Sequence, residues 1–62
     1  MTEHVSPALR YMRGIRNPAK RFYAFDVHEA LAAGKPLPDR PAALSVMAAQ
    51  AVQLRLGELV TS

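Results

Sequence analysis

Apolar residues dominate the last third of the chain, from Ala42 to Val60. The polar or charged side chains in this stretch are Ser45, Gln50, Gln53, Arg55 and Glu58. The preceding Asp39-Arg40-Pro41 is typical of a helix cap followed by a first-turn proline. The pattern therefore predicts a long C-terminal helix over 41–60, with its apolar part at about 42–60 and a length of about five turns. A helix with this much apolar surface needs another element to lie against.

The apolar positions of this predicted helix form two adjacent seams, with residues recurring at steps of three and four. The first seam holds Leu44, Met47, Ala51 and Leu54, and the second holds Ala48, Val52, Leu56 and Leu59. We expect one seam to cover the N-terminal part of the chain and the other to meet another chain. The alternative is that the many alanines reflect only the high helix propensity of that residue.

The start of the chain predicts a shorter, amphipathic helix over 6–16. Ser6-Pro7 is a favourable pair for an N-cap and a first turn. From Ala8 to Ile15, apolar residues recur at three- and four-residue spacing, which puts the arginines on the other face. Asn17-Pro18 ends this helix, because the residue before a proline is pushed out of the α region, and the same pair can begin the next helix.

A second helix is predicted over 18–33, ending at Gly34 as a left-handed C-terminal residue. Its expected buried stripe consists of Ala19, Phe22, Tyr23, Val27, Ala30 and Leu31. In the alternative, the aromatic-rich segment Arg21–Phe25 is extended, and Asp26 with Glu29 forms a capping box for a shorter helix. We favour the continuous helix, since a single extended segment has no obvious strand to pair with in so small a chain.

Residues 35–41 contain three prolines in seven positions, which predicts a stiff, extended connector. The whole chain, 1–62, is thus expected to be a single all-α domain of two or three helices. A domain of this size buries only ~60% of the surface that its unfolded chain exposes. Cysteine is absent, which removes disulfides and thiolate zinc ligands. Added stability is therefore expected to come from oligomerisation or from a partner protein.

Positive charge is concentrated near the N-terminus, in a chain whose formal net charge is +3. Five of the eight basic residues fall within twelve positions, namely Arg10, Arg13, Arg16, Lys20 and Arg21. Aromatic residues lie among them, so the segment has the charge and the rings to grip phosphates and stack on unpaired bases. An acidic protein partner, or solvent alone, would suit the same basic stripe.

The sequence gives little indication of catalytic or metal-binding chemistry. Asp26, His28 and Glu29 lie close together, but a zinc site needs three or four convergent ligands and both carboxylates suit a helix cap. There is no phosphate-binding glycine loop and no recognisable nucleophile, so we expect no enzyme activity, no catalytic or metal site and no cofactor.

The sequence also bears on the compartment. The first residues, 1–4, lack a basic region followed by an apolar run, so no signal peptide is expected. The polar side chains of the last helix argue against a bilayer span. We therefore expect a cytoplasmic protein.

The sequence favours a non-enzymatic interaction or assembly subunit, which forms a homo-oligomer or docks into a larger protein complex through the two seams. The alternative is a small dimeric nucleic-acid-binding regulator that uses the basic stripe at residues 10–21.

Overall fold

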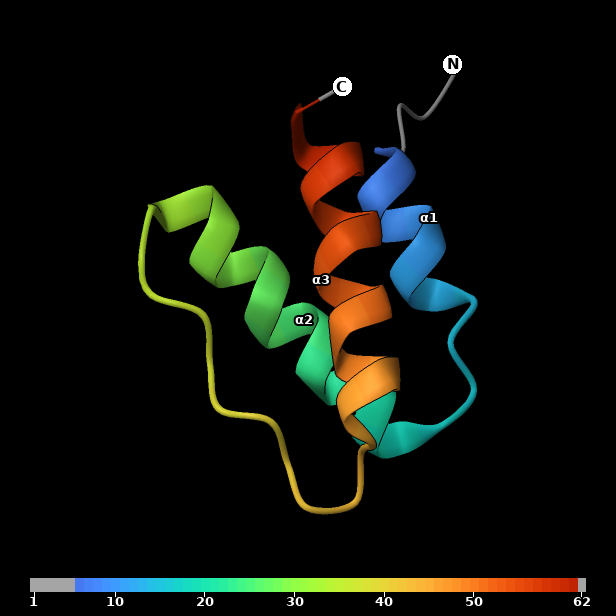
Figure 1. The fold of residues 1–62 in the computed structure, drawn as a ribbon. Coiled ribbons are helices and arrows are strands. Elements are labelled where there is room, and N and C mark those ends of the chain that lie inside the picture. The colour runs from blue at the N-terminus through green and yellow to red at the C-terminus, as the bar shows by residue number, and fades with distance from the viewer. Residues whose placement is uncertain (1–5, 62) are drawn as a thin grey trace.

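The computed structural model of the chain describes residues 6–61. These residues form three helices, α1 (Pro7–Arg13), α2 (Pro18–Ala33) and α3 (Val46–Thr61), which confirms the all-α prediction (Figure 1). None of the helices in this part of the chain is long and apolar enough to cross a membrane. The first residues, on which the signal-peptide expectation rests, lie outside the described part.

Helix α1 begins where the sequence predicts and ends earlier. The side-chain oxygen of Ser6 accepts a hydrogen bond from the backbone N–H of Leu9 at 3.2 Å, as an N-cap should. The helix ends at Arg13, before the expected boundary at residue 16. It ends there because the backbone N–H groups of Gly14 and Ile15 bond to carbonyls three residues back, which tightens the chain out of the α-helix.

Helix α2 is continuous, so the prediction of a helix over 18–33 is confirmed and the alternative of an extended Arg21–Phe25 is wrong. Asn17 caps its start by accepting from the backbone N–H of Lys20 at 3.1 Å. Asp26, the cap in the alternative, lies inside the helix. Gly34 ends the helix with a φ of 70°, the predicted left-handed conformation.

The buried face of α2 differs from the predicted stripe at one aromatic position. Tyr23, Val27 and Ala30 are buried as expected, and Ala24 joins them with no exposed surface. Phe22 was expected in the stripe, but 68% of its surface is exposed. The helix turns by about 100° per residue, which places Phe22 roughly 110° from the middle of the face that Tyr23, Val27 and Ala30 form, and so outside it.

Helix α3 begins at Val46, later than the prediction from Asp39-Arg40-Pro41. Its cap is Ser45, whose hydroxyl accepts from the backbone N–H of Ala48 at 3.1 Å. The preceding residues form a turn, in which the N–H of Leu44 donates to the carbonyl of Pro41 at 3.0 Å.

The late start of α3 has a packing reason. The turn directs Leu44 into the core, where only 4% of its surface is exposed, and Ala49 is buried in the same cluster. These two residues flank the first turn of the helix in the positions of a hydrophobic staple, which fixes the angle at which the chain enters the helix. The connector over 35–41 is non-helical, as predicted.

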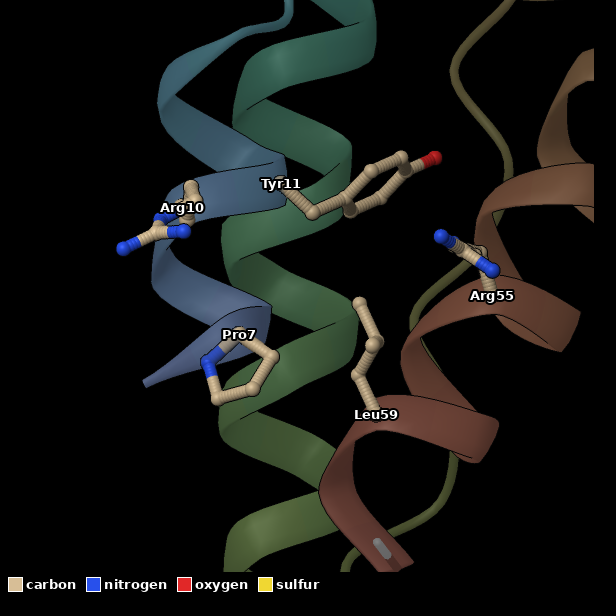
Figure 2. Close-up of a pocket in the computed structure, with 5 residues that line it drawn as sticks. All are labelled: Pro7, Arg10, Tyr11, Arg55 and Leu59. Atoms are coloured by element: carbon tan, nitrogen blue, oxygen red, sulfur yellow. The ribbon is translucent and has the colours of Figure 1, made fainter. Parts of the chain in front are cut away.

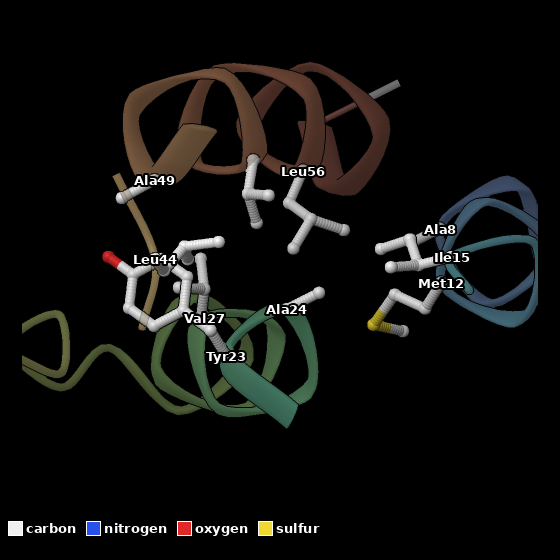
Figure 3. Packing of buried hydrophobic residues seen from close by; sticks show 10 residues of the cluster. Ala8, Met12, Ile15, Tyr23, Ala24, Val27, Leu44, Ala49 and Leu56 are labelled. Atoms are coloured by element: carbon white, nitrogen blue, oxygen red, sulfur yellow. The ribbon is translucent and has the colours of Figure 1, made fainter. Parts of the chain in front are cut away.

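The core lies between α2 and α3, which pack mainly against each other, and α1 covers the open side (Figure 3). The buried cluster consists of Ala8, Met12, Ile15, Tyr23, Ala24, Val27, Leu44, Ala49, Val52 and Leu56. A hydrogen bond crosses this interface from the side-chain amide of Gln53 to the hydroxyl of Tyr23 at 2.7 Å. The buried ring of Tyr23 thus keeps a polar partner for its hydroxyl.

Two leucines on α3 provide a direct test of this packing. Leu56→Ala should lower the free energy of unfolding by about 2–4 kcal/mol, because the side chain is fully buried. Leu54→Ala should change it by less than ~0.5 kcal/mol, because 71% of Leu54 is exposed. Urea unfolding followed by circular dichroism at low protein concentration measures both values. Equal losses in the two variants would contradict the orientation of α3.

Two glycines should respond in opposite directions to the same substitution. Gly34→Ala should lower the free energy of unfolding by about 1 kcal/mol, because alanine is strained at the positive φ. Gly57→Ala should raise it by about 0.5–1 kcal/mol, because Gly57 is helical and an added Cβ would meet open space. The same unfolding measurement applies, and a stabilising Gly34→Ala would show that α2 does not end there in a left-handed residue.

Candidate interaction surfaces

The eight residues predicted for a protein interface divide between the core and the surface. Val52 and Leu56 have no exposed surface and Leu44 has 4%, so these three side chains serve the core of the chain itself. Ala48 and Leu59 are half-buried and pack against that core. The second predicted seam is therefore the one that covers α1 and α2.

The remaining three predicted residues point to solvent. Met47 is 82% exposed and Leu54 71%, and Ala51 between them is exposed as well. Their spacing of four and three residues places them on one side of α3. Gln50 is exposed at the edge of the same stripe. We call Met47, Gln50, Ala51 and Leu54 the α3 outer face.

A second exposed apolar spot lies on α2 and was not predicted from the sequence. Phe22 is 68% exposed and Phe25 41%. Because α2 and α3 face each other across the core, the outward side of α2 points away from the α3 outer face (Figure 3). Two carboxylates, Asp26 and Glu29, are exposed on the same helix. In the sequence, the aromatic residues favoured a buried stripe, and no feature predicted that Phe22 and Phe25 are exposed.

The predicted basic residues come from α1, from the connection after it and from the start of α2. Arg10, Arg13 and Arg16 are exposed, whereas Lys20 and Arg21 are half-buried. None of the five forms an ion pair with a carboxylate among residues 6–61. Their charge is therefore available to an external anion.

A groove between α1 and α3 gathers part of this charge. It has a volume of about 340 Å³ and is lined by Pro7, Arg10, Tyr11, Arg55 and Leu59. Figure 2 shows the ring of Tyr11 reaching from α1 toward α3, where the guanidinium of Arg55 lies near its hydroxyl end. Arg55 was not among the predicted basic residues. In the sequence it stands out only as a positively charged residue within a mostly apolar helix.

A second hollow adjoins this groove and shares Arg10 and Tyr11 with it. Its volume is about 510 Å³, and its other lining residues are Gly14, Ile15, Arg16, Asn17 and Lys20. The fold thus brings four cations to the two hollows, namely Arg10, Arg16, Lys20 and Arg55. Arg13 and Arg21 line neither of them.

Negative charge lies mostly elsewhere in the described part of the chain. Asp26 and Glu29 line a separate hollow beside the proline-rich connector, together with Lys35. Glu58 approaches Arg55 at 3.9 Å, but both side chains are more than half exposed, so this pair binds weakly. An anion approaching the groove therefore meets mainly positive charge.

Within residues 6–61, no group of three or more histidine, cysteine, aspartate or glutamate side chains is placed to hold a metal ion. Of the cluster noted in the sequence, His28 is half-buried while Asp26 and Glu29 are exposed on α2. Comparison of the chain with protein-family models, with curated proteins and with solved structures finds no match.

Proposed function

We propose that this chain is a small non-enzymatic assembly subunit that pairs with a second copy of itself through the α3 outer face. The observation that supports this function most strongly is the exposure of Met47 and Leu54, two turns apart on one helix. Large exposed apolar side chains that group into one patch mark interaction sites, whereas singly scattered ones are ordinary on the surface of a monomer. The small Ala51 between them lets another helix approach closely.

The charge of the α3 outer face favours a second copy as the partner. Its side chains carry no formal charge, although the chain has a net charge of +3. A two-fold interface places the same patch of both subunits together, so a charged residue at its centre would face a like charge and be repelled. The uncharged residues at the axis avoid this repulsion, and Glu58, the next exposed position on the same side of α3, lies about two turns away from the axis. The basic residues around α1 would face like charge.

An antiparallel pair of α3 helices suits the spacing of this face. With the two-fold axis beside Ala51 and Gln50, Met47 of one copy lies opposite Leu54 of the other. Each large side chain then covers the other, and the small residues meet at the centre. This is the arrangement in which knobs of one helix fill the holes of its partner.

Because the chain is small, a stable dimer must bury a large share of its surface. A stable interface buries at least ~600 Å² on each partner, which is about an eighth of the 4702 Å² surface of this chain. The contact must therefore extend beyond the three apolar side chains along most of α3. Val46, 52% exposed at the start of the helix, lies roughly 90° from the middle of this face, and the exposed Glu58, four residues after Leu54, is the next position along it.

The test is the mass in solution of a double variant. Ala51→Glu with Leu54→Glu places two like charges on each side of the proposed two-fold axis and should abolish association. Sedimentation equilibrium at several concentrations should give twice the 6.8 kDa chain mass for the wild type and the single mass for the variant.

A matched control adds the same charges to the outward side of α2, with Phe22→Glu and Ala33→Glu. Both positions are exposed, so this variant should still form the dimer. A wild-type chain that stays monomeric at all concentrations would show the proposal to be wrong. An unchanged assembled mass in the Ala51→Glu, Leu54→Glu variant would place the interface elsewhere.

A second candidate function is nucleic-acid binding, with the same dimer acting as a small regulator. It is supported by the three exposed arginines around α1 and by the absence of ion pairs between the basic stripe and the described carboxylates. Binding through phosphates should weaken steeply between low and physiological salt, whereas the apolar association through α3 should persist or tighten.

A further inference from the structure

We propose that the groove between α1 and α3 binds single-stranded nucleic acid, with phosphates held by Arg10, Arg16 and Arg55 and a base stacked on Tyr11. This inference rests on the second candidate function and assigns it a specific site. That site differs from the basic stripe read from the sequence, since it includes Arg55 and leaves out Arg13 and Arg21.

The cations of this site come from separate parts of the chain. Arg10 belongs to α1, Arg16 to the connection after it, and Arg55 to α3, so only the folded protein gathers them. Arginine holds phosphate through two parallel N–H groups and its planar guanidinium also lies flat on bases. The one neighbouring carboxylate in the described chain, Glu58, is exposed and only weakly paired with Arg55.

Tyr11 adds an aromatic ring to the groove, which charged side chains alone would not provide. Its ring is half-buried and extends across the space between the helices, with Pro7 and Leu59 beside it (Figure 2). A ring held in this way is a ready platform for a base, and base stacking tolerates any sequence. The apolar neighbours suit the sugar and the edge of the base.

The shape of the site favours a single strand over other anions. The two hollows, about 340 and 510 Å³, share Arg10 and Tyr11 as lining residues, so a flexible backbone can reach from one to the other across these side chains. A duplex keeps its bases stacked inside the helix, where the ring of Tyr11 does not reach them. An acidic peptide supplies charge but no planar base for the ring.

The experiment uses the full chain and a fluorescently labelled oligouridylate of about a dozen nucleotides, a length that covers typical single-strand sites. Fluorescence anisotropy at about 50 mM salt should show Arg55→Gln binding about eightfold more weakly, the electrostatic contribution of one phosphate contact at that salt. The matched control, Arg13→Gln, makes the same charge change on α1 outside both hollows and should weaken binding less than about twofold.

Tyr11 is tested by two substitutions that keep an apolar side chain against the core. Tyr11→Phe retains the ring and should bind within about twofold of the wild type, whereas Tyr11→Leu should lose about five- to 150-fold through the missing stack. Helical content measured on the same samples shows that each variant is folded.

The outcomes separate this inference from the function on which it rests. A wild-type chain that does not bind the probe at low salt overturns both. If the wild type binds, but Arg13→Gln weakens binding as much as Arg55→Gln and Tyr11→Leu has no effect, nucleic-acid binding stands and the groove is not its site. Equally tight binding of a polyglutamate chain, with the same dependence on Arg55, overturns nucleic acid as the ligand in favour of an acidic protein.

Discussion

The contact between α2 and α3 is the one on which the rest of the structure depends. Val27 from one helix and Val52 and Leu56 from the other have no exposed surface, and the Gln53–Tyr23 hydrogen bond joins the same two elements. Helix α1 has only seven residues, too few to be stable in water by itself. It is held by burying Ala8 and Met12 against the α2–α3 pair. The groove beside α1 therefore depends on the packing of α2 against α3.

A small core explains why α3 has two apolar faces with different surroundings. The two neighbouring helices, of seven and 16 residues, cover only one side of the 16-residue α3. The side bearing Val52 and Leu56 is buried, and the side bearing Met47 and Leu54 stays exposed. The same limit applies to α2, where Tyr23 is buried and Phe22 is exposed. In so small a domain, surplus apolar residues are left for a partner or for solvent.

The two proposed surfaces are neighbours on α3. Leu54 belongs to its outer face and the next residue, Arg55, lines the groove toward α1. In the proposed dimer, each copy would therefore carry its groove beside the shared interface, and the two grooves would flank the two-fold axis. A strand that spans the axis would meet both sites, and the effective concentration of the second site would strengthen binding without any new contact.

The sequence by itself determined the helices and most of their ends. Ser6-Pro7, Asn17-Pro18 and Gly34 act through hydrogen bonds and φ angles within a few residues, so their effect can be read locally. The tertiary structure alone decided that Phe22 faces solvent, that Leu44 enters the core ahead of a helix capped by Ser45, and that Arg55 joins Arg10. Each of these depends on which face of a helix meets its neighbour. Both faces of α2 and α3 carry apolar residues, so periodicity left that choice open and only the packing of distant segments settled it.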